Sequence, residues 1–356
     1  MDESADLPHL QAIIDAMPSP VVAIDSGSIA IAANARARVV LPGLRIDQPV
    51  ALALSAAELI EAIDHAIATS QSQRAHFSQR VPADRWYEVH VVPVRPPAAV
   101  PGSGRMLLLL TFNDLTPLYR VEQMRADFVA NASHELRTPL AALSGFIDTL
   151  QGPARDDPQA REKFLGIMQG QASRMARLID DLLSLSRIEL RAHVTPEEPA
   201  DLVAIVRQVL DGLQTLARER EMQIALAAPE ESLTVRGDRD ELTRLFENLV
   251  ENALKYGASG KRVDVQLETI PAGDGQAKVD EVKVAVRDYG VGIAPEHLPR
   301  LTERFYRVDA GQSRAEGGTG LGLALVKHIL NRHRGRLEIA STLGKGSTFI
   351  AYLPLG

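Results

Sequence analysis

Apolar residues recur at spacings of three and four along two stretches in the middle of the chain. This spacing is typical of helices that carry one apolar stripe. The second stretch covers residues 164–185, and residues 152–158, which contain glycine and proline, separate it from the first. The stripe of the first stretch consists of Val129, Ala132, Leu136, Leu140, Leu143, Ile147 and Leu150. The pattern predicts an antiparallel helical hairpin, and covering both stripes requires a second copy of the chain in a dimeric four-helix bundle.

The residues before the hairpin predict a small α/β module. A helical pattern covers residues 9–16, a short strand follows at 20–25, and a second helical pattern covers 51–69. Partial alternation predicts strands at 74–81, 85–94 and 105–112, with a Pro/Gly-rich loop at 96–104. Thr116 precedes Pro117 and is expected to cap a helix that continues into the hairpin. Such a helix would couple this module mechanically to the hairpin.

The residues after the hairpin alternate between helical and strand patterns. A linker rich in Pro and Glu is expected at residues 192–201 and a polar loop at 271–280. Helices are predicted at 202–219, 239–255 and 320–332, and strands at 222–226, 263–269, 282–287, 336–341 and 347–353. This alternation predicts a mixed sheet covered by helices on one side. The whole chain is therefore expected to be a multidomain α+β protein.

The composition narrows the classes of function. The 356 residues suffice for two or three domains, and the hydrophobic fraction of 45% suffices for packed cores. A net charge of −7 argues against nucleic acid as a direct partner. The chain has no cysteine, which excludes disulfides, thiolate catalysis and Cys-ligated zinc and fits a reducing compartment.

The apolar runs are too short for a membrane span. The longest, near residues 20–24 and 106–112, fall far short of the roughly 20 residues that a spanning helix needs. The N-terminus is acidic and lacks the basic region of a signal peptide. The chain as written is expected to be cytoplasmic. A tether upstream of Met1 that holds it at the inner face of the plasma membrane, or an upstream adaptor protein, stays open.

A candidate nucleophile lies on the first predicted helix of the hairpin. His134 falls outside the apolar stripe, so its imidazole is expected to be exposed. Glu135 flanks it, and Thr138 lies one turn further along the same face. An exposed imidazole beside a carboxylate can act as a nucleophile with its base. The alternative is a solvated surface histidine without a chemical role.

Two clusters in the last third of the chain suggest a nucleotide site. Asn248 and Asn252 are four residues apart on a helix, with Lys255 close by. Asparagine oxygens suit Mg²⁺, and a lysine suits phosphate, although two asparagines on a solvated helix face would look the same. Asp288 follows a predicted strand and precedes Gly290 and Gly292. This carboxylate can accept a hydrogen bond from an exocyclic amine such as that of adenine, and the alternative is an ordinary strand-to-turn corner.

The third cluster is a glycine-rich loop that opens a predicted helix. Gly317, Gly318, Gly320 and Gly322 offer backbone N–H groups at a helix N-terminus, where phosphate oxygens bind well. The spacing is neither the Rossmann nor the P-loop pattern. Residues 305–316, which include Arg307 and Arg314, are expected to form a mobile lid with cations for phosphates, or else an ordinary solvent loop.

These motifs, in this order along the chain, resemble those of the two-component sensor histidine kinases. The resemblance covers residues 118–356, and within it the segments around His134 and residues 178–189 are similar to the phosphate-regulon sensor kinases. Residues 1–117 resemble a PAS sensor domain. The resemblance divides the chain into a PAS-like sensor domain at 1–117, a dimerisation and phosphotransfer hairpin at 118–191 and a Bergerat-type α/β sandwich ATP-binding domain at 192–356.

The resemblance also implies roles for individual residues. His134 would accept the phosphoryl group of ATP, Glu135 would be its general base, and Thr138 would position a water when the same helix dephosphorylates the partner. Asn252 would bind Mg²⁺, and Asp288 would recognise adenine. The complete set of implied ATP-binding residues is Asn248, Asn252, Lys255, Tyr256, Asp288, Gly290, Gly292, Ile293, Arg307, Gly318, Thr319, Gly320, Leu321 and Gly322.

The family resemblance further implies partners. They are a second copy of the chain and a response regulator on a separate chain, whose aspartate receives the phosphoryl group in phosphate-limitation signalling. Two alternatives stay open. One is an ATP-driven conformational clamp of the same nucleotide-binding fold, as in chaperone and mismatch-repair ATPases. The other is a dimeric scaffold that binds ATP without transferring its phosphoryl group.

Overall fold

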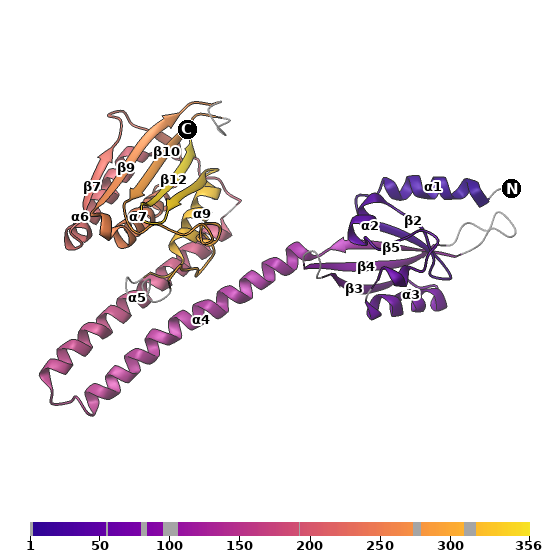
Figure 1. The fold of residues 1–356 in the computed structure, drawn as a ribbon, viewed down its shortest axis with the longest axis horizontal. Coiled ribbons are helices and arrows are strands. Elements are labelled where there is room, and N and C mark those ends of the chain that lie inside the picture. Colours follow the sequence, from indigo (N-terminus) through magenta and orange to yellow (C-terminus); the bar gives the residue numbers. More distant parts are fainter. Residues whose placement is uncertain are drawn as a thin grey trace. The chain divides into compact units, whose positions relative to one another are not determined.

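The computed structural model describes residues 3–54, 56–79, 84–94, 106–191, 193–272, 279–309 and 318–356 (Figure 1). Its internal contacts divide the chain into two units, Met1–Val129 and Ala130–Gly356. The loop predicted at 96–104 lies outside the described residues, as do most of the loop predicted at 271–280, the part of the predicted lid that contains Arg314, and Gly317 of the glycine-rich loop.

The first unit contains one five-stranded sheet in the order β2-β1-β5-β4-β3. All neighbouring strands run antiparallel. The alternating pattern located β1, β3, β4 and β5, whereas β2 was not predicted because a strand of four residues carries too little alternation. The strands are β1 (Val21–Asp25), β2 (Ala30–Ala33), β3 (Gln73–Gln79), β4 (Arg85–Val94) and β5 (Leu107–Asp114).

Helices cover both faces of this sheet. Successive residues of β1 point to opposite faces, so that Val22 and Ile24 join the larger core while Val21 and Ala23 join a smaller one with Ile14. The larger core packs against α2 and α3 and the smaller one against α1. These helices are α1 (Glu3–Asp15), α2 (Ala35–Val40) and α3 (Ala57–Thr69), with a 3₁₀ turn at Val50–Leu52.

Helix α4 (Thr116–Gln151) begins where β5 ends and continues across the division between the two units. The prediction that Thr116 caps this helix with its side chain was wrong. Its hydroxyl accepts a hydrogen bond from the Trp86 N–H at 3.0 Å instead, while the Asp114 carboxylate accepts from the Thr116 N–H at 2.8 Å. The start of the helix is therefore bonded to strands β4 and β5.

Helices α4 and α5 (Pro158–Leu190) form the predicted hairpin and lie side by side (Figure 1). Asp157 caps α5 by accepting from two backbone N–H groups at 3.0 Å, and the rings of Phe146 and Phe164 stack at 5.3 Å. Part of the apolar stripe faces solvent in the single chain: Leu140 is 55% and Ile147 42% exposed. The predicted dimeric bundle would cover these side chains and stays a prediction.

The second unit contains a five-stranded sheet in the order β11-β12-β10-β9-β7. Strands β7 and β9 are parallel and the other pairs antiparallel, so the sheet is mixed, as predicted. The strands are β7 (Gln223–Ala227), β9 (Arg262–Ile270), β10 (Glu281–Asp288), β11 (Arg336–Thr342) and β12 (Gly346–Pro354). A separate pair, β6 (Pro199–Asp201) and β8 (Thr234–Arg236), was not predicted, and β6 lies at the end of the expected linker.

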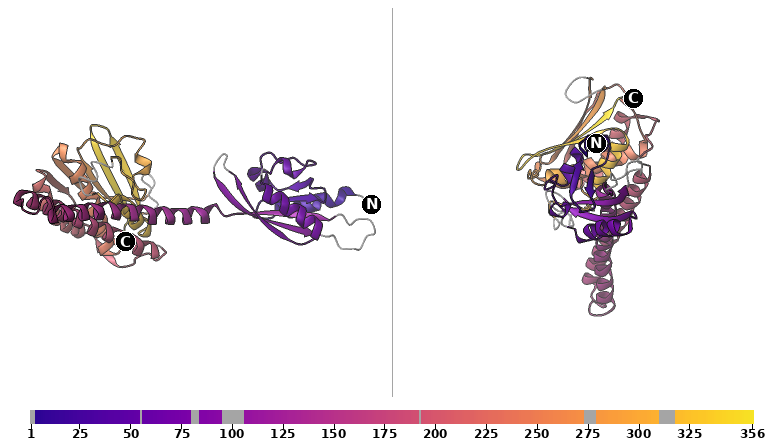
Figure 2. Two further views of the ribbon diagram at one scale, coloured as in Figure 1. Left: turned by 90° about the horizontal axis from the view of Figure 1, so that it is seen from below. Right: turned by 90° about the vertical axis from the view of Figure 1, so that its right-hand side faces the viewer.

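One face of this sheet packs on α6 (Leu202–Glu219), α7 (Arg239–Tyr256) and α9 (Gly322–Arg332). Val282, Val284 and Val286 of β10 alternate with more exposed residues and are fully buried, which is the pattern of a sheet with one covered face. Figures 1 and 2 show the strands as one layer and these helices as another. Short 3₁₀ turns occur at Ala258–Gly260 and Leu298–Arg300.

The described residues thus form an α+β chain, which confirms the predicted fold class at this level. Within them, none of the helices combines the length and the apolar character that crossing a membrane would require.

Candidate nucleotide-binding and phosphotransfer site

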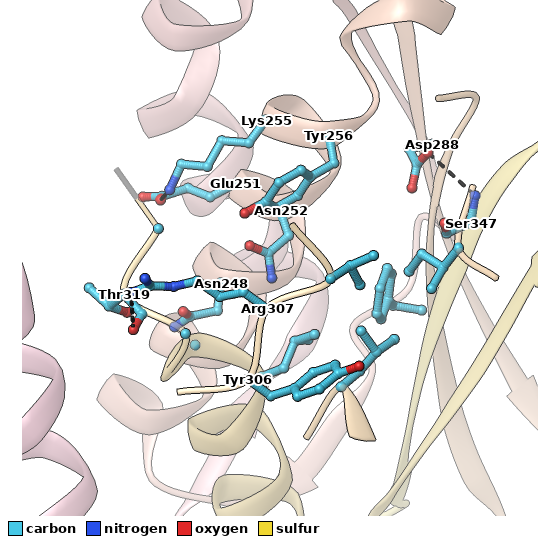
Figure 3. A pocket seen from close by; sticks show the side chains of 18 of the residues that line it. Asn248, Glu251, Asn252, Lys255, Tyr256, Asp288, Tyr306, Arg307, Thr319 and Ser347 are labelled. Atoms are coloured by element: carbon cyan, nitrogen blue, oxygen red, sulfur yellow. Dashed lines mark hydrogen bonds and ion pairs between the residues drawn. The ribbon is translucent and has the colours of Figure 1, made fainter. Parts of the chain in front are cut away.

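A cavity of about 270 Å³ lies in the second unit beside helix α7 and the end of strand β10 (Figure 3). It brings together twelve of the fourteen predicted ATP-binding residues. These twelve are Asn248, Asn252, Lys255, Tyr256, Asp288, Gly292, Ile293, Arg307, Gly318, Thr319, Gly320 and Gly322. The pocket therefore unites three motifs that are far apart in the sequence.

Helix α7 contributes one polar face to the pocket. Asn248 donates from Nδ2 to the Arg244 carbonyl at 2.7 Å, and Lys255 donates to the Glu251 carboxylate at 2.6 Å. The Asn252 amide points into the pocket in Figure 3 and makes no hydrogen bond with the described residues. Its oxygen is therefore available to a ligand, as the prediction of a metal-binding amide requires.

Asp288 lies at the other end of the pocket, at the last position of β10 (Figure 3). The residue is 4% exposed, and its Oδ1 accepts from the backbone N–H groups of Gly290 at 2.9 Å and Ser347 at 3.3 Å. Burial raises the pKa of Asp288, and these two backbone hydrogen bonds oppose that rise. Both of these donors bind Oδ1, and Asp288 lines the cavity, so its carboxylate can also accept from a ligand N–H group.

Two glycines allow the backbone to line the pocket closely. Gly292 has φ of +70°, and a Cβ there would lie 2.1 Å from the Thr342 carbonyl oxygen. Gly320 has φ of +75°, and a Cβ there would lie 2.9 Å from the Phe305 backbone. A side chain at either position would be strained and would clash.

Gly290 and Leu321 are the two predicted residues that do not line the cavity. Gly290 lies behind Asp288 and donates its N–H to that carboxylate. Leu321 is fully buried and precedes the first residue of α9. Both positions support the pocket from outside it, and their predicted contact with a nucleotide stays a prediction.

The glycine-rich loop is held by hydrogen bonds at Thr319. Its carbonyl accepts from Arg307 Nη2 at 2.8 Å, and its hydroxyl donates to Asp181 of α5 at 2.8 Å. The Arg307 side chain is only 6% exposed. Figure 3 shows Thr319, Arg307, Asn248 and Lys255 at the end of the pocket away from Asp288. The cations and amides therefore gather at one end of the pocket, and Asp288 lies at the other end.

The candidate phosphoacceptor helix reaches the same arginine. Glu135 accepts from Arg307 Nη2 at 2.9 Å and Nη1 at 3.2 Å, and from Arg174 of α5 at 2.9 Å. His134 next to it is exposed, as predicted, and its ring makes no hydrogen bond with the part of the chain that is described. The Thr138 hydroxyl donates to the His134 carbonyl at 3.2 Å. Arg307 thus joins the two candidate sites that the sequence suggested separately.

Sequence reasoning missed Arg174, Asp181 and Arg244. Arg244 lies four residues before Asn248 on the same helix face, which is a signal that the spacing rule could have found. Asp181 and Arg174 lie on α5 and reach the site only through the packing of the second unit, which no local pattern reports.

The donors present fit a magnesium–nucleotide ligand. Mg²⁺ is usually held by one or two protein oxygens together with waters and substrate phosphates rather than by a full protein cage. Among the described residues no group of three or more histidines and carboxylates could hold a metal alone. Asn252 would supply the protein oxygen, and the bound ion would neutralise phosphate charge.

Family models match both parts of the second unit. The model of the His Kinase A (phospho-acceptor) domain matches residues 124–191, and that of the histidine kinase-, DNA gyrase B- and HSP90-like ATPase matches residues 237–356. The first match includes His134 and the hairpin, and the second includes the pocket.

Several known proteins are similar to this chain. The phosphate regulon sensor protein PhoR of Pseudomonas aeruginosa is 42% identical over 252 residues, which are 70% of this chain and 54% of that protein. The sensor protein kinase WalK of Staphylococcus saprophyticus is 32% identical over 246 residues, which are 69% of this chain and 39% of that protein. The chain therefore spans about half or less of the length of these relatives.

Among solved structures, the histidine kinase ThkA in complex with response regulator protein TrrA aligns over 97% of this chain and 98% of that one, with a TM-score of 0.51 and 18% identity. At this identity the likeness concerns the fold alone. Together, the two domain matches and the relatives place the chain in the family of sensor histidine kinases, and it is similar to PhoR.

Proposed function

We propose that this protein is an ATP-dependent histidine kinase that phosphorylates His134 and passes the phosphoryl group to an aspartate of a separate response regulator. The observation that carries the proposal is the bond between Arg307 and Glu135. An arginine of the nucleotide pocket there touches the carboxylate next to the exposed histidine. A clamp or a scaffold that only binds ATP has no need of such a link.

The pocket residues would hold ATP in one orientation. Asp288 would accept from the adenine amine at the buried end, while Asn252, Lys255 and Arg307 would face the phosphates at the other end. Mg²⁺ held with Asn252 would neutralise phosphate charge. Phosphoryl transfer needs little more from a protein than such positioning and charge neutralisation.

Glu135 would assist the attack of the histidine. A neutral imidazole nitrogen would attack the γ-phosphorus and form a phosphorus–nitrogen bond, while the bond from that phosphorus to the bridging oxygen breaks and ADP leaves. The other ring nitrogen carries a proton that Glu135 can accept. In the present structure Arg307 and Arg174 occupy this carboxylate. Transfer therefore requires Arg307 to release the Glu135 carboxylate and to bind phosphate oxygens instead. Glu135 is then available to accept the proton from the imidazole. The Thr138 hydroxyl would position water for dephosphorylation of the regulator.

The proposal extends to the domains and partners. Residues 1–117 would be a PAS-like sensor domain, which the five-stranded antiparallel sheet with helices on both faces supports. Residues 118–191 would form the homodimer, which the exposed stripe of the hairpin supports. Residues 192–356 would bind ATP. Similarity to PhoR supports a role in phosphate-limitation signalling.

The stability of the label distinguishes a kinase from the alternatives. The full chain is incubated with Mg²⁺ and γ-labelled ATP, and the protein is then treated with acid or with alkali. A kinase of this type gives a protein-bound label that acid removes and alkali does not, because a phosphorus–nitrogen bond behaves in this way. ATP hydrolysis without protein-bound label would instead support the clamp, and binding with neither would support the scaffold.

A further inference from the structure

Asp181 of helix α5 holds two groups of the nucleotide pocket. Its Oδ1 accepts from Arg244 Nη2 at 2.6 Å, and its Oδ2 accepts from the Thr319 hydroxyl at 2.8 Å. The residue is 8% exposed, although it lies on a helix of the hairpin. Both of its partners line the pocket. One carboxylate of the hairpin therefore ties helix α7 to the glycine-rich loop.

Arg244 is placed to recognise phosphate. It lies one helical turn before Asn248, and the Asn248 side chain donates to its carbonyl at 2.7 Å. Its Nε is buried and has no hydrogen-bond partner within the described residues. A guanidinium binds phosphate through two parallel N–H groups, and here one of its donors is still unused beside the pocket.

Three of the cations that line the pocket are paired with carboxylates of the protein. Arg244 pairs with Asp181 and Lys255 pairs with Glu251, each at 2.6 Å. Arg307 pairs with Glu135 at 2.9 Å. Asp181 and Glu135 both belong to the hairpin. A polyphosphate that binds here must displace the carboxylates from these cations. A phosphate and a carboxylate that shared one cation would repel each other.

We propose that Arg244 is a phosphate-binding residue of this pocket, and that Asp181 competes with nucleotide phosphates for Arg244 and Thr319. The inference rests on the proposed nucleotide-binding function and deepens it. Asp181 stands where a phosphate oxygen would bind, so the hairpin contact and the binding of a polyphosphate oppose each other. By linkage, whatever strengthens this hairpin contact weakens ATP binding by the same factor.

The test compares two neighbouring aspartates and two ligands. Asp181→Asn removes the charge but leaves an oxygen for Thr319, and Asp180→Asn is the matched control because Asp180 is exposed on the same helix. Magnesium–ATP and adenosine are titrated separately into the full chain by calorimetry. Asp181→Asn is expected to bind ATP about fivefold tighter, the size of one ordinary hydrogen bond, with adenosine affinity unchanged. Asp180→Asn is expected to match the wild type with both ligands.

Arg244→Gln provides a second and independent variant. It is expected to weaken ATP binding about tenfold and to leave adenosine binding unchanged, with Arg244→Lys between it and the wild type. The inference is overturned if Asp181→Asn binds ATP like Asp180→Asn, or if Arg244→Gln weakens ATP and adenosine equally. If the wild type shows normal ATP binding and label on His134 while Asp181→Asn has no effect, the proposed function stands without this inference. If the wild type binds neither ligand, both are overturned.

Discussion

Asp288 is a carboxylate whose ionisation the fold makes costly. Burial raises its pKa above the ordinary value of 3.8, and its two backbone hydrogen bonds only oppose that rise. Between 3.8 and the higher folded value the folded state binds more protons than the unfolded state, so the free energy of unfolding falls as pH rises through this window. At neutral pH the ionised group therefore destabilises the free protein, and a bound ligand that donates to it offsets this cost.

Asp288→Asn should accordingly separate stability from binding. The substitution keeps an oxygen for Gly290 and Ser347 and removes the charge, so the ligand-free protein at pH 7 should gain on the order of 1 kcal/mol. The affinity for ATP should fall by about tenfold or more. The amide NH₂ of asparagine is a donor, so it cannot accept the hydrogen bond that the adenine amine donates. Thermal unfolding and ATP titration measure the two effects.

Asp264→Asn is the control for the stability effect. Burial acts to raise the pKa of Asp264, but the hydrogen bonds from Arg262 and Tyr289, each at 2.6 Å, outweigh it, and the net pKa is lowered. This substitution should lower stability at neutral pH. A loss of stability in Asp288→Asn as well would contradict the assignment of Asp288 as a strained, ligand-ready carboxylate.

The residues that local spacing could predict are those that share one helix face or one turn. Asn248, Asn252 and Lys255 were predicted in this way, and the cavity contains all three. Asp181 could not be predicted from local spacing, because its partner Arg244 is 63 residues away in the sequence. Nothing in its own segment distinguishes it from the exposed Asp180. Its burial arises only when α5 packs against the ATP-binding half of the unit.

At the scale of elements, helices α7 and α9 meet at a buried histidine. His333, at the end of α9, has an Nδ1 that donates to the Ile329 carbonyl at 2.8 Å and an Nε2 that accepts from the Asp238 N–H at 3.0 Å. Its side chain is fully buried, and the charged groups that face it are Glu241, Arg332 and Asp238. Burial lowers the pKa of His333, and this arrangement needs the neutral ring.

The free energy of unfolding should depend on pH because of His333. Below the ordinary value of 6.5 the unfolded state takes up a proton that the folded ring resists, so the free energy of unfolding falls as pH drops from 6.5 toward the folded pKa. In His333→Gln, the free energy of unfolding, measured with urea, should fall less than in the wild type over that pH range. The difference should be on the order of 1 kcal/mol. His193→Gln, which changes an exposed histidine, should retain the wild-type profile. An identical slope in His333→Gln and the wild type would rule out His333 as the source.

The exposed stripe of the hairpin makes a prediction about assembly. Leu140 and Ile147 are 55% and 42% exposed in the single chain, and a second copy would cover them. Leu140→Asp together with Ile147→Asp should raise the dimer dissociation constant at least about a hundredfold, because two unpaired carboxylates per chain would be buried. Sedimentation measures the dissociation constant. Leu343→Asp, at a residue 67% exposed outside the hairpin, should remain dimeric; a monomeric wild type would contradict the bundle.

Long periodic elements were predicted well, and very short ones were not. The predicted limits of α6 and β4 agree with the structure because each has a sustained pattern. Strands β2, β6 and β8 have three or four residues, too few for alternation to show. The cap of α4 was assigned wrongly because the Thr116 hydroxyl bonds to β4, a tertiary contact that the helix signal does not contain.

At the scale of the molecule, the second unit joins the candidate phosphoacceptor helix to the candidate nucleotide pocket. Glu135 and Arg307 are 172 residues apart in the sequence and hydrogen-bonded in the structure. The sequence motifs predicted both sites, but only the fold shows that they meet at one arginine. The proposed kinase activity therefore requires phosphoryl transfer from this pocket to one particular histidine, His134.

The most direct test is to locate the label. The full chain, His134→Gln and His193→Gln are each incubated with Mg²⁺ and γ-labelled ATP, and ATP binding is measured in parallel. We expect acid-labile label on the wild type and on His193→Gln, none on His134→Gln, and similar ATP binding in all three. Undiminished label on His134→Gln, or ATP binding without label on any of the proteins, would contradict the account.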